Sequence, residues 1–213
     1  KQFADNYAVD LYGKVVTGVF SSDGCIYVSE PKGIGGIRVS TTQSGLSVGD
    51  RVDVFGKMST RVLSGYPSER QISYASVTKI SSGAAPNPVA MSCKSVGGAA
   101  IGSLVPGVRN GIGANNMGAL IRITGKVTKV IGSYLFVDDG SNVENVSGSG
   151  PEIGVMVRCA TTPSVSVGNI VSVTGIAEGS IPTGWTTNRC YLRLRDANDL
   201  RLIYTAPTTG TIS

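Results

Sequence analysis

The sequence predicts an all-β protein in which one small domain occurs twice. VGDRVDVFG, at residues 48–56, returns as VGNIVSVTG at residues 167–175. Each copy is a glycine turn followed by a strand with alternating apolar residues. Glycine supplies 29 of the 213 residues and only 15% of residues are charged, a composition typical of turn-rich β proteins. These two observations define the predicted fold class.

The repeat extends on both sides of this segment. YGKVVTG is answered by ITGKVTK, CIYVSEP by YLFVDDG, and GIRVSTT by GVMVRCATT, in the same order. The offset between the copies changes only where loops change length. We therefore divide the chain into a first domain at 1–82, a linker at 83–118, a second domain at 119–203 and a tail at 204–213.

Each domain is predicted to contain five strands. In the first domain they lie at 11–20, 25–30, 37–40, 51–59 and 69–80, because Val, Ile and Tyr are frequent there and Gly or Pro occupies the gaps. A turn is predicted at 21–24 and a loop at 61–68, and residues 45–50 are too few for a helix. In the second domain the strands lie near 120–131, 133–138, 154–159, 169–177 and 189–195.

Five strands with a break after the third predict an OB-fold-like barrel without its helix. The predicted fold is therefore two tandem five-stranded barrels joined by a long linker that packs across a barrel. The apolar residues expected to anchor this linker are Val89, Met91, Val96, Ile101, Leu104 and Val105. The alternative is an immunoglobulin-like sandwich, which needs about seven strands per domain.

Four segments carry a resemblance to a known group of proteins. EPKGIGGIRV, VGDRVDVFG, PNPVAMSCKSVGG and NGIGANNMGALIRITGKV resemble tandem OB-fold segments of secreted bacterial proteins, over nearly the whole chain from Val9 to Leu202. The resemblance implies the fold and export, and it provides no catalytic residues. Cys93 stands in the linker pattern where a polar residue is expected, which suggests a local disulfide.

Cysteine usage bears on both metal binding and export. The chain has four cysteines without a CxxC pair and no histidine, which argues against a zinc site. An even number on a loop-rich β scaffold favours disulfides and export. Strand alternation places Cys25 outward, where it could bond Cys93. Cys159 and Cys190 point inward as a second bond or as two buried thiols, and the sequence leaves all three pairings open.

The same alternation predicts a ligand-binding surface on the second domain. It is formed by Tyr134, Phe136, Met156 and Arg158 on adjacent strands, where OB folds usually bind oligosaccharides or oligonucleotides. The corresponding residues of the first domain, Tyr27 and Arg38, make a poorer platform. Trp185, in a loop, is either a further sugar-binding residue or a loop anchor. The alternative is that the other domain, the linker or a neighbouring subunit covers this surface.

No combination of nucleophile and base suggests an enzyme, and no cofactor is expected. Our main hypothesis is a secreted or cell-surface structural protein that assembles with copies of itself through its terminal segments. The tail APTTGTIS has few charges and suits pairing with a sheet edge of another molecule. The other hypotheses are a module that binds a glycan, or less favoured a single-stranded nucleic acid, and an accessory domain of a larger surface enzyme.

Charge and hydropathy add three expectations about location and partners. The net charge is +5 without a dense Lys/Arg run, which favours a mildly basic solvated surface over a nucleic-acid site. No stretch of about 18 apolar residues is present, so no membrane span is predicted. A chain that begins at Lys1 without Met is expected to be a processed form.

Overall fold

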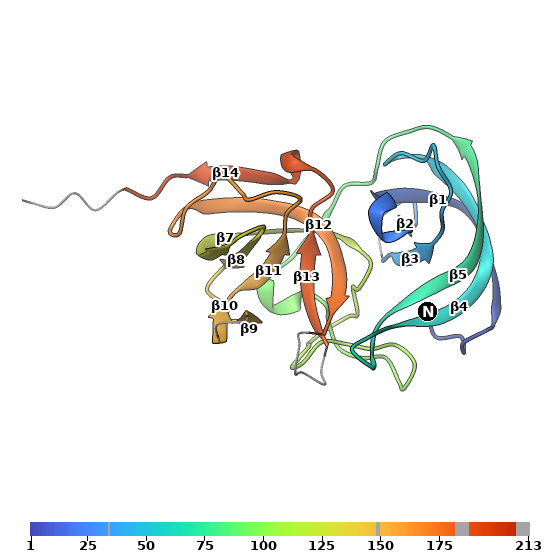
Figure 1. Cartoon of the computed structure of the whole chain (residues 1–213), viewed down its shortest axis with the longest axis horizontal. Coiled ribbons are helices and arrows are strands. Elements are labelled where there is room, and N and C mark those ends of the chain that lie inside the picture. Colours follow the sequence, from blue (N-terminus) through green and yellow to red (C-terminus); the bar gives the residue numbers. More distant parts are fainter. Residues whose placement is uncertain (34, 148–149, 182–187, 208–213) are drawn as a thin grey trace, which may run out of the picture.

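The computed structural model describes residues 1–33, 35–147, 150–181 and 188–207. It contains two β-rich halves that lie side by side, joined by a long connection (Figure 1). Helical structure among the described residues is limited to three short 3-10 turns, at Ser21–Asp23, Cys93–Ser95 and Ala197–Asp199. The prediction of an all-β chain is therefore confirmed.

The first half is a closed ring of five strands with the order β1-β2-β3-β5-β4. Strands β3 and β5 run parallel and every other neighbouring pair is antiparallel. Apolar side chains such as Val16, Val54 and Ile72 fill the interior. The strands are β1 (Ala8–Phe20), β2 (Cys25–Ser29), β3 (Ile37–Ser40), β4 (Arg51–Leu63) and β5 (Tyr66–Ser81).

Strands β4 and β5 are longer than predicted because the expected loop at 61–68 is part of a hairpin. They remain paired to Leu63 and Tyr66, where Ser64 and Gly65 make the turn with positive φ angles of 51° and 82°. Pro67 is accommodated opposite Val62, at a register shift near the end of the ladder. Gly65 and Pro67 suggested a loop in the sequence, but Gly65 lies in a tight turn and Pro67 lies just after it in β5.

The second half is built on a seven-stranded sheet in which an additional pairing closes a ring. Strands pair in the order β7-β8-β11-β13-β12, and β12 also pairs with β7. β11 and β13 are parallel, as β3 and β5 are in the first half. The strands are β6 (Val89–Ala90), β7 (Leu120–Ile131), β8 (Tyr134–Asp138), β11 (Val155–Arg158), β12 (Ile170–Ser180), β13 (Arg189–Arg193) and β14 (Leu200–Tyr204).

Two differences separate this half from the first. The pairing that β5 makes along β4 is divided here between β13 and β14, which both pair with β12. A further hairpin, β9 (Glu144–Ser147) and β10 (Gly150–Ile153), lies in contact with β7 and β8. This hairpin has no counterpart among the strands predicted from the sequence.

The repeated segment has the same local structure in both halves. Gly49 and Gly168 have φ angles of 95° and 92°, a left-handed conformation that favours glycine. The next residue, Asp50 or Asn169, accepts a hydrogen bond from the backbone N–H three residues earlier, at 2.8 and 2.9 Å. The two copies therefore agree in turn geometry as well as in sequence.

The connection between β5 and β7 packs mainly on the second half. Cys93, Val96 and Met117 are buried in the core of that half. Ile101 and Leu104, which were expected to act as anchors, are exposed. The linker thus contributes some of its apolar residues to a core formed by strands that follow it in the chain.

The N-terminal segment is bound to the first half. The buried guanidinium of Arg70, on β5, donates to the backbone carbonyls of Lys1 and Phe3 at 3.1 and 2.6 Å and pairs with the Asp5 carboxylate. The N-terminal segment was expected to contact another molecule, but these bonds hold it against its own half of the chain. Of the tail, residues 208–213 lie outside the described residues.

Candidate functional site

The two halves meet at a surface that we call the seam. Phe20, Cys25 and Tyr27 of the first half form one buried apolar cluster with Leu120 and Ile176 of the second. The rings of Phe20 and Tyr27 meet edge to face with centroids 5.9 Å apart. The seam therefore has an apolar core like that within a domain.

A buried network of charges continues this contact. Arg61, on the β4–β5 hairpin, donates to Glu69 of its own half at 2.8 Å and to Glu178 of the second half at 2.7 Å. Both carboxylates are almost fully buried. Tyr27 donates its hydroxyl to Glu69 at 3.1 Å. Arg61 is therefore a bridge between two buried carboxylates on opposite sides of the seam.

Arg193 makes a second bridge in the opposite direction. It extends from β13 to Asp23 of the first half and also lies 3.4 Å from Glu178 of its own half. Its guanidinium carbon is 3.8 Å from the centroid of the Phe20 ring, in the geometry of a cation–π contact. Charges thus cross the seam from both halves.

Burial changes the acid–base properties of this network. Burial, reinforced by the neighbouring Glu178, raises the pKa of Glu69 to about 7, although Arg61 and Arg38 oppose the change. Burial alone would lower the pKa of Arg61, but Glu69 and Glu178 outweigh it and raise that pKa. The Tyr27 pKa is raised by burial and by Glu69. The network can therefore gain or lose a proton at Glu69 near neutral pH.

The predicted ligand surface is largely covered. Tyr27, expected to point outward, is fully buried in the seam, and Arg38 is buried beside it, where it donates to Gln71. Phe136 is also buried, on a strand that the unpredicted β9–β10 hairpin contacts. Neither Tyr27 nor Phe136 belongs to the core of its own half, so their direction agrees with the predicted alternation. The surface is nevertheless covered, which is the alternative reading, because strand alternation does not show what packs on either face. For Tyr27, the covering element is the other half of the chain.

Tyr134 and Arg158 remain accessible at the rim of the seam. They line a cleft of about 430 Å³ together with Arg193 and Arg195. Tyr134 and the Arg158 side chain are each 36% exposed. Met156 is half-buried, and Trp185 lies outside the described residues. Hydroxyl-bearing residues from both halves complete the lining of the cleft: Ser21, Ser22 and Ser133.

The three arginines of this cleft differ in how well they are neutralised. Arg195 makes a two-pronged contact with Asp199, at 2.9 and 2.6 Å. Arg193 is occupied by its contacts across the seam. Arg158 lies 3.8 Å from Asp23 and 3.5 Å from the Tyr191 hydroxyl. Arg158 is therefore the cation that is most available to an anion entering the cleft.

The four cysteines are free thiols, so the predicted disulfides are not formed. Cys25 belongs to the apolar cluster of the seam, whereas Cys93, Cys159 and Cys190 belong to the core of the second half. Burial raises the pKa of Cys93 to about 12 and that of Cys159 to about 11. The even number of cysteines therefore no longer supports export.

The described residues contain no group of three or more His, Cys, Asp or Glu side chains that could hold a metal ion. None of their helices has the length and apolar character needed to span a bilayer.

The charged residues of the seam were not among those predicted from the sequence. Glu178 stands alone between apolar residues and glycines in IAEGS, and Glu69 opens a predicted strand. An isolated acid inside an apolar strand is a signal of a buried ion pair. The partner Arg61 could not be inferred, since it was assigned to a loop and is remote in sequence from Glu178.

No protein-family model matches the sequence, and no curated protein matches it. Among solved structures, the chain is similar to that of a murine DNA-binding protein bound to double-stranded DNA, with a TM-score of 0.39 and 11% sequence identity. The superposition covers 95% of this chain and 98% of the other.

Proposed function

We propose that the chain is a non-catalytic tandem OB-fold protein that binds an acidic polysaccharide in the cleft at the rim of the seam. The observation that supports this most is the convergence of Tyr134, Arg158, Arg193 and Arg195 on one cleft. Guanidinium groups suit carboxylates and sulfates, because their N–H groups form charge-assisted hydrogen bonds.

The strand order supports the OB-fold part of the proposal. A ring of five strands with a parallel pair between the third and the fifth occurs in the first half and recurs in the second. Such barrels usually bind ligands on the face of their second and third strands. Here Tyr27 of β2 and Arg38 of β3 are buried, so a ligand would have to bind at the rim.

The aromatic residues favour a glycan over a single-stranded nucleic acid. Non-specific binding of single strands depends on several exposed rings that stack on successive bases. Around this cleft Phe20 and Tyr191 are buried, and Tyr134 is the exposed ring. One ring beside Arg158 and three serines suits the carboxylates and hydroxyls of an acidic sugar chain.

Binding to four probes tests the proposal: polygalacturonate, heparin, dextran and an oligo-dT strand. We expect both acidic glycans to bind, with affinity that falls as salt rises, while dextran does not bind. Arg158→Gln should weaken this binding about tenfold, because it removes a charge-assisted hydrogen bond. Arg51→Gln, at an exposed position of β4, is the matched control. Preference for oligo-dT, or equal binding by Arg158→Gln, would contradict the proposal.

Self-assembly remains a second candidate because of strand β14. It is at the edge of the second sheet, and its consecutive residues Leu202, Ile203 and Tyr204 are 50%, 60% and 55% exposed. An unpaired apolar edge is a template for pairing with another chain. The original hypothesis also assigned assembly to the N-terminal segment, but that segment is bound to its own half of the chain and gives this part no support. Export now depends on the sequence resemblance alone.

Light scattering of Ile203→Lys tests this candidate. If β14 pairs with a second copy, the intact chain should be oligomeric and the variant monomeric, since a charge on an edge strand opposes pairing. Ile80→Lys, at an exposed position near the end of β5, is the control. A monomeric intact chain at high concentration would exclude assembly through this edge.

A further inference from the structure

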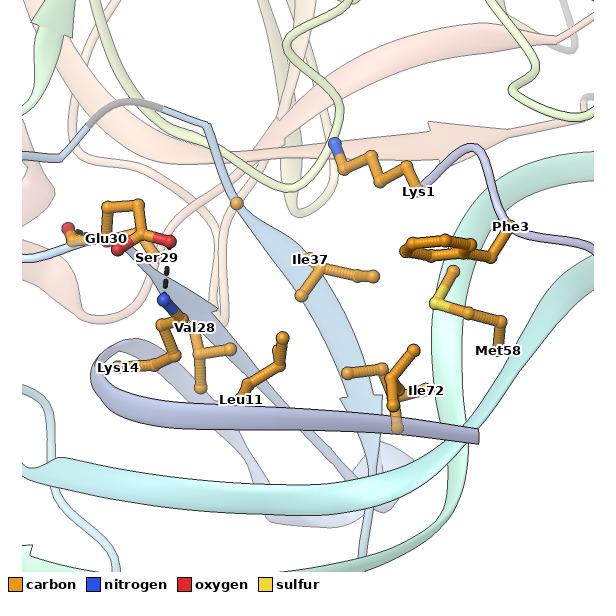
Figure 2. Close-up of a pocket in the computed structure, with 12 residues that line it drawn as sticks. Lys1, Phe3, Leu11, Lys14, Val28, Ser29, Glu30, Ile37, Met58 and Ile72 are labelled. Atoms are coloured by element: carbon orange, nitrogen blue, oxygen red, sulfur yellow. Dashed lines mark hydrogen bonds and ion pairs between the residues drawn. The ribbon is translucent and has the colours of Figure 1, made fainter. Parts of the chain in front are cut away.

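A second pocket lies at the open end of the first barrel, away from the seam cleft. Its volume is about 200 Å³, somewhat larger than the ~150 Å³ apolar cavity in which an engineered protein binds benzene. Figure 2 shows apolar side chains pointing toward one another across it, and they come from all five strands of the first barrel. These side chains are Leu11, Val28, Ile37, Met58 and Ile72.

The N-terminal segment forms one wall of this pocket. Phe3 lies over Met58 (Figure 2). Its ring also stacks on that of Tyr7, with centroids 4.4 Å apart. Arg70 fixes the backbone of this segment through the carbonyls of Lys1 and Phe3. The wall is therefore anchored by a buried side chain.

Two lysines line the rim, and they differ in their partners. Lys14 is paired with Glu30 at 2.5 Å. The Lys1 ammonium donates to the backbone carbonyl of Met117 and makes no ion pair with any described residue. Burial lowers the pKa of Lys1 to about 8, although the more distant charge of Glu69 opposes this change. The pocket thus combines an apolar interior with one ammonium group that has no direct ion pair among the described residues.

We propose that this pocket binds a short aliphatic carboxylate, whose chain occupies the apolar space and whose carboxylate pairs with the Lys1 ammonium. The volume suits a chain of about six carbons, by comparison with the benzene-sized cavity. A neutral alcohol of the same length fills the space without the ion pair, and an amine places a like charge beside Lys1. The proposal is independent of the glycan site.

Methyl NMR of the intact chain, titrated separately with hexanoate, hexan-1-ol and hexylamine, tests the site. Hexanoate should produce saturable shifts at the methyl groups of Ile37, Met58 and Ile72. Its affinity should exceed that of hexan-1-ol about tenfold, the effect of one partly buried ion pair, and hexylamine should bind less tightly than either. Absence of saturable shifts at these methyl groups would overturn the proposal, as would equal affinity for hexanoate and hexylamine.

Three variants separate the charge from the cavity. Lys1→Met should reduce hexanoate affinity to that of hexan-1-ol and leave hexan-1-ol binding unchanged. Lys126→Met, at an exposed position of β7, should change neither. Leu11→Phe fills the space and should abolish the binding of both, while its methyl spectrum reports whether the barrel is intact. Unchanged hexanoate binding by Lys1→Met would exclude the assigned role of this lysine.

Discussion

Glu69 is the residue whose environment departs most clearly from its sequence neighbourhood. It is fully buried, it faces a second carboxylate, Glu178, through the shared Arg61, and its pKa is raised to about 7. A buried ion pair of this kind contributes little net stability compared with apolar residues. The shared Arg61 nevertheless joins the hairpin of the first half to β12 of the second.

The Glu69 carboxyl should make stability depend on pH. Its folded-state pKa lies above the unfolded value of 4.5, so the folded chain binds the proton more tightly. Its contribution to stability is complete below pH 4.5 and is lost as pH rises toward 7. Urea unfolding between these limits should show the loss, on the order of 3 kcal/mol. Glu69→Gln should remove this part of the pH dependence, and an unchanged profile would contradict the assignment.

The buried thiols provide a second prediction at this scale. Cys25, Cys93, Cys159 and Cys190 are buried and free, and a thiol reagent requires an accessible thiolate. Native protein should therefore react slowly with Ellman's reagent, whereas protein in guanidinium chloride without reductant should release all four equivalents. A lower number in the denatured protein would indicate disulfides and support the original expectation.

At the scale of elements, the agreement of sequence and structure follows from local patterns. The strand predicted at 120–131 is observed as β7, and the third strand as β3, because alternation and bounding glycines are local signals. The buried state of Phe136 could not be predicted, since it depends on tertiary contacts of β8. The charges of the candidate site were missed for the same reason.

The close approach of β12 to β5 gives a prediction at this scale. A Cβ atom at Gly179 would lie 2.4 Å from the backbone oxygen of Ser68, which cannot move without displacing the strand. Gly179→Ala should therefore lower the free energy of unfolding by about 1–3 kcal/mol. Gly83→Ala, where the nearest atom is 3.4 Å away, is the control for chemical denaturation. Equal stability of the two variants would mean that the strands separate easily.

At the scale of the whole molecule, the seam should couple the two halves. It contains a buried apolar cluster and two bridging arginines, and an apolar contact of this kind opposes independent motion of two domains. Calorimetry should therefore show one cooperative transition for both halves.

Arg61→Met should disturb this coupling. It leaves Glu69 and Glu178 buried without their shared cation, a change that typically costs about 3–5 kcal/mol. We expect a lower melting temperature and, if the seam opens first, two transitions. Lys14→Met, which breaks the more exposed pair with Glu30, should cost less than about 1 kcal/mol. Two transitions in the unmodified chain would show that the halves unfold independently.

The bridges across the seam have a consequence for the history of the duplication. Arg61 of the first copy pairs with Glu178 of the second, and Arg193 of the second copy pairs with Asp23 of the first. If each copy were expressed separately, the charged and apolar residues that contact the other copy would be exposed, and the isolated copy would be prone to aggregate. The two copies are therefore complementary at the seam, and neither could replace the other there.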